Sequence, residues 1–181
     1  ALPVRVVVAR GAIFFGWLFF AASWTPVERK RLIVVFVLFV ASAIFWSVFE
    51  QAGSSMNLFA QRNTDNQVGD YAIPAPWYQS INALFIITLA PVFAGLWSWL
   101  GPKDPSSPAK FAWGLGLGGF GFVILAVGAT RAEAGILVSP MWLLVTYLFH
   151  TMGELCLSPV GLSGMTKLAP ARVAGLMMGV W

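Results

Sequence analysis

The feature that most constrains the fold is a series of apolar stretches, each as long as the hydrocarbon core of a membrane requires. A helix needs about 20 apolar residues to cross that core. Such stretches lie at residues 3–24, 32–60, 77–100, 111–130 and 140–167, and a further one opens at Val173 and runs to Trp181. Short polar segments separate them. The sequence therefore predicts an all-α, polytopic membrane protein.

Composition excludes several other classes of protein. Only 10% of the residues are charged and 59% are hydrophobic, whereas soluble domains are about 25% charged. The net charge of +4 does not indicate nucleic-acid binding, because the Lys and Arg residues are scattered along the chain. A single cysteine, Cys156, offers no internal disulfide, and no cluster of metal ligands, catalytic nucleophiles or bases is visible. We expect no enzyme activity, no metal and no cofactor.

The basic residues indicate which loops face the cytoplasm. Most of them follow alternate apolar stretches, and by the positive-inside rule these loops are predicted to be cytoplasmic. They are Arg29, Lys30, Arg31, Lys103, Lys110, Lys167 and Arg172. The chain begins without Met and stops inside an apolar stretch. We expect a fragment of a longer membrane protein.

Polar residues form a stripe within the stretch 32–60. Ser47, Glu50, Ser54 and Asn57 recur at three- and four-residue steps, which places them on one face of a regular helix. Trp46 lies one turn before Glu50. A carboxylate facing lipid is costly, so this face is predicted to meet protein or a water-filled cavity. A purely structural carboxylate is the alternative to a functional one.

The stretch 140–167 carries a second polar face, with Tyr147, His150, Thr151, Glu154 and Ser158 at helical spacing. A carboxylate in a low-dielectric site can exchange a proton for a cationic substrate, which makes Glu154 a candidate for proton coupling. His150, one turn earlier, either shares that proton or, as we favour, bonds a neighbouring group or faces the outer aqueous end.

Two features of the intervening stretches complete the candidates. Asn82 offers both a donor and an acceptor, which suits a peptide or an ammonium group, although Asn also links membrane helices to one another. Gly114, Gly118 and Gly121 fall partly within a Gly-x-Gly-x-x-Gly pattern, but no strand precedes it. We predict instead that these glycines let a neighbouring helix approach closely.

Three segments together resemble the proton-dependent oligopeptide transporters, a family of the major facilitator superfamily. They are Phe-Trp-Ser-Val-Phe-Glu-Gln at 45–51, Tyr-Gln-Ser-Ile-Asn at 78–82 and Gly-Glu-Leu-Cys-Leu-Ser-Pro at 153–159. The resemblance covers about residues 27 to 181. It implies helices seven to ten and the start of helix eleven, the beginning of the C-terminal half of the fold. Residues 1–26 would be one of two extra helices that bacterial members carry between the halves.

The resemblance also implies a function and a site. It implies symport of di- and tripeptides with protons across the bacterial cytoplasmic (inner) membrane by alternating access. Glu154 would bind the amino terminus of the peptide, helped by Asn82, and Trp46 and Trp181 would line a side-chain pocket. Ser158 is a weaker candidate contact, and Glu50 would serve proton coupling or gating.

The implied partners are peptides, protons as the coupling ion, the lipid bilayer and the N-terminal half of the same transporter, with the protein acting as a monomer. Two alternatives stay open. The parent protein could carry another small solute, such as nitrate or an amino acid, although Glu154 disfavours an anion. It could also be a non-transporting membrane scaffold with a degenerate site.

Overall fold

The computed structural model describes residues 4–20, 23–132 and 135–180 of the chain. The described residues form two compact units. The terminal unit comprises residues 1–40 and 162–181, and the central unit comprises residues 41–161.

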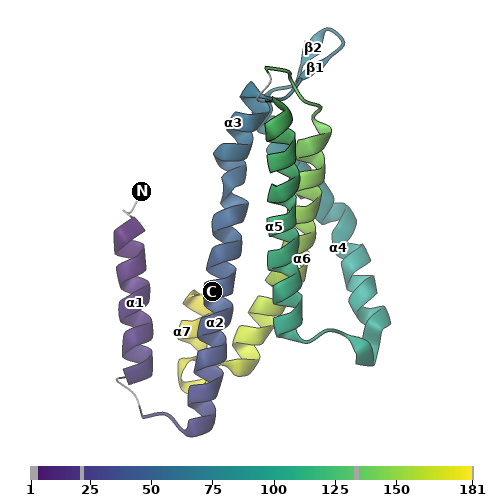
Figure 1. Ribbon diagram of the computed structural model, residues 1–181. Coiled ribbons are helices and arrows are strands. Elements are labelled where there is room, and N and C mark those ends of the chain that lie inside the picture. Colours follow the sequence, from purple (N-terminus) through teal and green to yellow (C-terminus); the bar gives the residue numbers. More distant parts are fainter. Residues whose placement is uncertain (1–3, 21–22, 133–134, 181) are drawn as a thin grey trace. The chain divides into compact units, whose positions relative to one another are not determined.

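Helices make up almost all of the structure (Figure 1). The α-helices are α1 (Val4–Phe20), α2 (Pro26–Phe49), α3 (Ser55–Arg62), α4 (Ser80–Leu100), α5 (Ser107–Ala132), α6 (Met141–Leu168) and α7 (Ala174–Val180). Short 3-10 helices are η1 (Glu50–Gly53), η2 (Ala75–Gln79), η3 (Gly101–Lys103) and η4 (Ala171–Val173), and one hairpin pairs β1 (Gln67–Val68) with β2 (Tyr71–Ala72). Among the described residues, 4 helical segments are long and apolar enough to cross a membrane: Pro26–Arg62, Ala75–Lys103, Ser107–Ala132 and Met141–Gly161.

Helix α2 begins earlier than the apolar stretch from Leu32 suggests, because a capping box starts it within the polar segment. The backbone N–H of Thr25 donates to Glu28 Oε2 at 2.9 Å, and the N–H of Glu28 donates to Thr25 Oγ1 at 3.3 Å. Pro26 follows Thr25 as the first helical residue, where its missing N–H costs nothing. The basic run Arg29–Arg31 is therefore helical.

The stretch expected as one helix over 32–60 is interrupted at its polar end. α2 ends at Phe49, η1 covers Glu50–Gly53, and α3 starts at Ser55. Gln51 stabilises this break, because its side-chain oxygen accepts hydrogen bonds from the hydroxyls of Ser54 (3.0 Å) and Ser55 (2.6 Å). A 3-10 turn has 3.0 residues per turn, so the regular spacing that would align Glu50 with Asn57 does not carry through it.

A compact loop connects α3 to α4 in the central unit. Tyr78 donates its hydroxyl hydrogen to Asn66 Oδ1 at 3.0 Å, and Asn66 Nδ2 donates to the carbonyl of Ala60 at 2.7 Å. The 3-10 helix η2 occupies the start of the stretch expected as helical from Trp77, and α4 proper begins at Ser80. These bonds anchor the first turn of α4, which carries Asn82.

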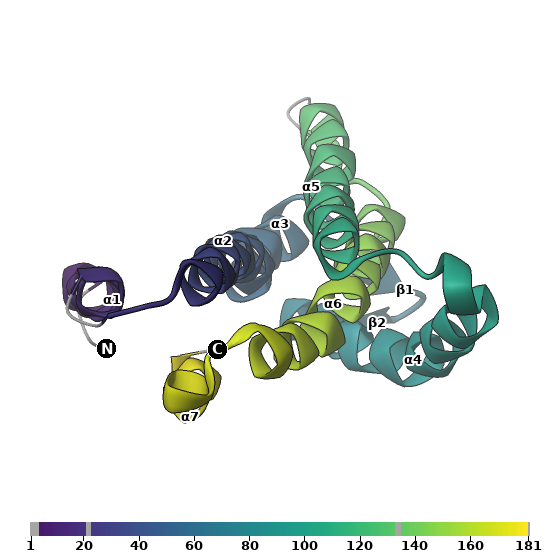
Figure 2. The ribbon, with the colours of Figure 1, turned by 90° about the horizontal axis from the view of Figure 1, so that it is seen from below.

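Glycines of α5 bring it close to its neighbours, as the sequence predicted. A Cβ added at Gly114 would lie 2.9 Å from the carbonyl oxygen of Gly153 on α6, and one at Gly121 would lie 2.7 Å from the His150 ring. A Cβ at Gly118 would lie 3.3 Å from the Phe45 ring on α2. The prediction of close helix approach at Gly114, Gly118 and Gly121 is confirmed. Figure 2 shows α5 and α6 adjacent when viewed along their length, with α4 diverging from them.

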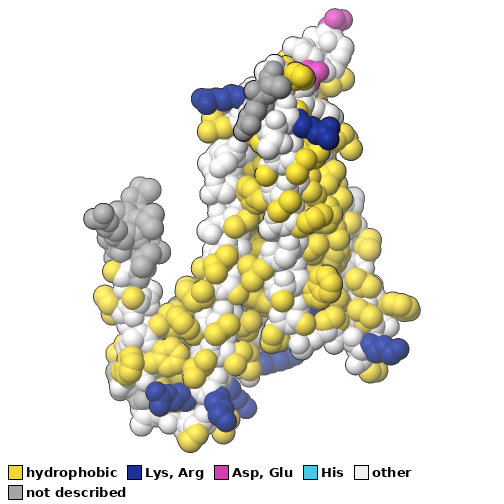
Figure 3. All heavy atoms as spheres, in the orientation of Figure 1, with side chains coloured by type: hydrophobic (Ala, Val, Ile, Leu, Met, Phe, Trp, Pro, Cys, Tyr) yellow, Lys and Arg dark blue, Asp and Glu magenta, His cyan; other side chains and the backbone are white. Residues whose placement is uncertain are grey.

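Two basic side chains lie at opposite ends of α5. α5 carries Lys110 in its first turn and Arg131 in its last, so the two mark opposite ends of one helix. Lys110 is buried, bonds Asp104 at 2.7 Å and lies 4.3 Å from the centre of the Trp97 ring. Between these ends the face of α5 in Figure 3 is largely hydrophobic, as contact with lipid requires.

The terminal unit has its own packing. Phe15 of α1 contacts Phe36 and Phe39 of α2, with ring centres 4.9 and 5.0 Å apart. Arg172, in η4, pairs with Glu28 at 3.5 Å and stacks over the Trp24 ring at 4.7 Å. The ion pair and the cation–π contact of Arg172 thus link the beginning of α2 and the residue before it to η4.

Candidate functional site

The central unit brings two of the predicted site residues together. Asn82 Nδ2 lies 3.5 Å from Glu154 Oε2, at the outer limit of a hydrogen bond. The hydroxyl of Thr151 donates to Asn82 Oδ1 at 2.6 Å. Asn82, Thr151 and Glu154, here called the polar cluster, therefore form a chain of contacts between the start of α4 and the middle of α6.

Local structure explains how the polar cluster is presented. Thr151 and Glu154 are three residues apart in an unbroken helix, so their side chains lie on the same face of α6. Asn82 lies in the first turn of α4, which the loop before it anchors. Thr151 is fully buried, whereas Asn82 and Glu154 are half-buried. The Glu154 carboxylate is thus partly accessible, whereas the Thr151 hydroxyl is not.

The chemistry of the polar cluster suits a positively charged group. A carboxylate within a membrane span is energetically costly unless it is paired or serves a cavity. Asn82 supplies one amide donor to Glu154, which leaves the remaining oxygen lone pairs free to accept hydrogen bonds. An ammonium group, with three donors and a positive charge, is complementary to such acceptors.

The aromatic candidate Trp46 belongs to a ring cluster on α2. Its ring lies 5.7 Å from Phe45 and 5.2 Å from Phe49, both edge-on. The structure positions Trp46, which is half-buried, through these neighbours on its own helix and not through the polar cluster.

The remaining predicted residues are placed as follows. Glu50 is exposed and opens the 3-10 turn η1. Ser158 is half-buried on α6, one turn after Glu154. Trp181 lies outside the described residues. Among the described residues, no hydrogen bond of the polar cluster involves Glu50 or Ser158.

His150 is buried among contacts with α2 and α5. It is 1% exposed, hydrogen-bonds the backbone of Gly118, and packs against the rings of Phe122 and Phe49 at 4.9 and 6.2 Å. Its Nε2 has no hydrogen-bond partner among the described residues. The interpretation we favoured, a histidine bonded to a neighbouring group, agrees with this geometry.

One residue of the polar cluster had no role assigned from the sequence. Thr151 was placed on the polar face of its helix, but helical spacing gives no partner on another helix. Its contact with Asn82 joins residues 69 positions apart, which only the packing of α4 on α6 reveals.

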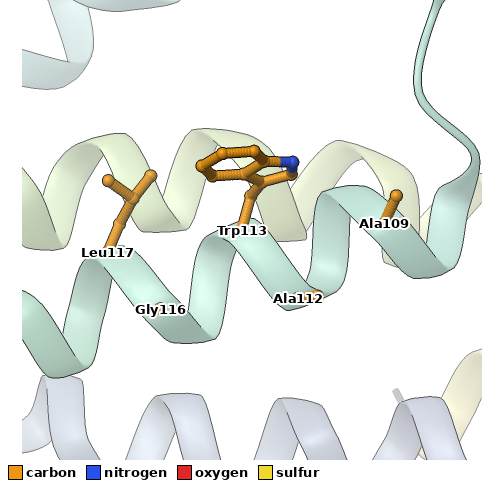
Figure 4. Close-up of a pocket in the computed structure, with 5 residues that line it drawn as sticks. All are labelled: Ala109, Ala112, Trp113, Gly116 and Leu117. Carbon is orange, nitrogen blue, oxygen red and sulfur yellow. The ribbon is translucent and has the colours of Figure 1, made fainter.

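An apolar hollow lies outside the polar cluster. A hollow of about 420 Å³ lies on α5 alone (Figure 4), where Trp113 and Leu117 project from the helix beside Gly116. With no ionisable side chain in its lining, the hollow is a surface that lipid can fill. Among the described residues, no three His, Cys, Asp or Glu side chains gather as metal ligands.

Spanning helices, two of which carry the polar cluster, define a polytopic membrane protein. Comparison with known proteins makes this specific. Residues 4–181 match the POT family, so the chain belongs to that family of transporters. The family consists of transporters and not of enzymes, and it has a major-facilitator type of fold.

Named relatives are peptide transporters. The chain is 46% identical to peptide transporter YePEPT of Yersinia enterocolitica, over 100% of this chain and 36% of the relative. It is 36% identical to dipeptide and tripeptide permease A of Salmonella typhi, again over 100% of this chain and 36% of the relative. The chain thus spans about a third of the length of these relatives.

Solved structures give the same picture. The peptide transporter POT in complex with sulfate matches with a TM-score of 0.91 and 41% identity, over 98% of this chain and 36% of that one. A mutant of that transporter in complex with alafosfalin matches equally well. A POT family transporter in complex with 5-aminolevulinic acid matches with a TM-score of 0.86 and 34% identity, over 96% and 36% of the two chains.

Proposed function

We propose that this chain supplies half of the peptide site of a proton-coupled symporter for di- and tripeptides in the bacterial cytoplasmic membrane. The observation that carries the proposal is the half-buried Glu154 carboxylate within a membrane span, facing the amide of Asn82. The names of the relatives, a peptide transporter and a dipeptide and tripeptide permease, support the same substrate class.

Each candidate residue has a role in this proposal. Glu154 binds the α-ammonium group of the peptide, and Asn82 orients the carboxylate and contacts the peptide. Trp46 and Trp181 line a pocket for a peptide side chain, with Ser158 as an additional polar contact. Glu50 acts in proton coupling or gating at the turn where α2 ends. The carboxylate of the peptide would bind in the other half of the transporter.

Symport requires that a proton moves inward together with the peptide. With an ammonium group bound, the Glu154 carboxylate remains ionised and the pair is neutral, so the proton that accompanies the peptide is carried by another group, for which Glu50 is the candidate in this chain. A proton that only replaced the ammonium on Glu154 would travel in the direction opposite to the peptide. Each proton entering down a potential of 100 mV supplies about 2.3 kcal/mol. Alternating access of the site then couples this energy to peptide uptake.

A second candidate is transport of an amino-acid-like solute. The POT family transporter in complex with 5-aminolevulinic acid favours it, because that ligand has an amino group but no peptide bond. Both candidates require Glu154, so a dipeptide must be compared directly with a single amino acid. Nitrate is disfavoured by the same carboxylate, and a non-transporting scaffold is disfavoured by the intact Glu50, Asn82 and Glu154.

The decisive experiment is uptake of a labelled dipeptide by the full-length transporter in proteoliposomes, with and without an imposed proton gradient. Glu154→Gln preserves size and removes the charge, and we expect it to abolish gradient-driven uptake. Glu28→Gln is the matched control, because Glu28 caps α2 and takes no part in the polar cluster. We expect near-normal uptake from this control.

Competition defines the group that is recognised. An N-acetylated dipeptide lacks the ammonium and should not compete, whereas the free dipeptide should. If Glu154→Gln transports normally, or the acetylated peptide competes equally, Glu154 does not bind the amino terminus and the proposal fails. Competition by a single amino acid as strong as by the dipeptide would favour the second candidate.

A further inference from the structure

We propose that Thr151 is a positioning residue of the peptide site, whose hydroxyl sets the orientation of the Asn82 amide so that its NH2 group points at Glu154. The inference rests on the proposed function of Glu154 and extends it to a residue that does not touch the substrate. Its basis is the chain of contacts from Thr151 through Asn82 to Glu154.

A carboxamide has two different ends, and only one of them suits a carboxylate. The NH2 group of Asn82 donates toward Glu154, whereas in the reversed orientation an amide oxygen would face a carboxylate oxygen with no hydrogen between them. The Thr151 hydroxyl lies 2.6 Å from Asn82 Oδ1 and donates to it. By satisfying the oxygen end, Thr151 favours the orientation in which the NH2 group serves Glu154.

Burial strengthens this selection. Thr151 is 0% exposed, so water cannot take over from its hydroxyl. The hydroxyl has one hydrogen and two acceptors within reach, Asn82 Oδ1 at 2.6 Å and the carbonyl oxygen of Tyr147 at 2.8 Å. A threonine whose hydroxyl bonded only its own helix would have no reason to lie this close to Asn82. The short contact between α4 and α6 is what singles Thr151 out.

The same helix provides a matched comparison. Thr146 is also 0% exposed, but its hydroxyl bonds the carbonyl oxygens of Trp142 (2.8 Å) and Gly121 (3.2 Å). It therefore has a backbone role and no contact with the polar cluster. Thr→Val is nearly isosteric and removes only the hydroxyl, so Thr146→Val controls for the general cost of that change.

The test is a double-mutant cycle in the full-length transporter, with Thr151→Val, Asn82→Ala and the two combined. Uptake kinetics of a dipeptide give KM and kcat, and thermal unfolding of the same purified proteins gives a measure that needs no transport. We expect Thr151→Val to raise KM about tenfold with kcat within about twofold, which corresponds to about 1.4 kcal/mol and to one buried hydrogen bond. Thr151→Ser should restore KM, and Thr146→Val should leave it unchanged.

The cycle separates a positioning role from a structural one. If Thr151 acts through Asn82, then in the Asn82→Ala background Thr151→Val does not change KM further. In that background it also lowers the unfolding temperature by less than it does in the unsubstituted protein. Full additivity in both measures, no effect of Thr151→Val, or failure of serine to rescue would overturn the inference. Thr151→Ala replaces valine if that variant does not assemble.

Failure of the proposed function would look different. In that case Glu154→Gln would take up the dipeptide as well as the unsubstituted transporter does. This result is obtained before any Thr151 variant is made. The unfolding cycle would still decide whether Thr151 and Asn82 are coupled, so the two failures are distinguishable.

Discussion

Gly153 offers a direct test of how closely α5 and α6 approach. A Cβ added to this residue would lie 2.7 Å from the carbonyl oxygen of Gly114 and 3.0 Å from the Phe45 ring. The first of these atoms belongs to the backbone of α5 and cannot rotate away. Gly153→Ala therefore requires the two helices to separate locally, and the residue directly precedes Glu154.

The expected magnitude is the balance of two effects. Inserting a methyl group into a well-packed interface costs about 1–3 kcal/mol. Alanine is favoured over glycine in a helix by about 1 kcal/mol. The difference is about 0–2 kcal/mol, and because the clash is with a backbone atom we expect Gly153→Ala to lie near the upper end, at about 1–2 kcal/mol. Gly116→Ala on α5 is the matched control, because nothing lies within 4 Å of a Cβ there; it keeps the gain in helix propensity without the steric clash.

The measurement is the apparent unfolding temperature of the purified full-length transporter in detergent, recorded for both variants and the unsubstituted protein under identical conditions. Gly153→Ala should unfold below the unsubstituted protein, and Gly116→Ala at or above it. If Gly153→Ala unfolds at the same temperature as Gly116→Ala or at a higher one, the two helices are not too close at this point to accept a methyl group, and the reasoning is refuted.

Two other contacts in the central unit lead to further predictions. Lys110→Met removes a cation whose side chain is 9% exposed, and it leaves Asp104 without its partner at 2.7 Å. The Asp104 side chain is 35% exposed and therefore partly solvated. We expect the free energy of unfolding to fall by only about 1–2 kcal/mol, measured by thermal unfolding. The double variant with Asp104→Asn should recover part of it. Tyr78→Phe removes the bond to Asn66 and should cost about 1 kcal/mol, with faster amide hydrogen exchange in residues 63–74 than in α5.

Each of these predictions has a clear contrary result. An unchanged unfolding temperature for Lys110→Met, or no recovery in the double variant, would mean that the ion pair contributes nothing to stability. Unaltered exchange in residues 63–74 after Tyr78→Phe would mean that the loop is held by other contacts.

Much of the candidate site was accessible from the sequence, because polar groups inside apolar stretches are rare and costly. Glu50, Asn82 and Glu154 stand out in this way without any knowledge of helix packing. Thr151 does not, because a threonine in a membrane helix can bond its own backbone. The start of α2 at Pro26 was not predicted, because the polar segment before Leu32 was expected to separate two apolar stretches.

By itself the sequence determined the spanning helices, the intramembrane carboxylates, the close-approach glycines and the resemblance to the POT family. The physical reason is that a helix in lipid satisfies its own backbone hydrogen bonds within a few residues, so hydropathy and spacing along the chain suffice to indicate it. Only the tertiary structure decided that α2 gives way to a 3-10 turn at Glu50, that His150 fills the space beside Gly121, and that the Thr151 hydroxyl meets Asn82. Those outcomes depend on how side chains on different helices meet. The spacing of residues within one helix does not determine its register against another helix.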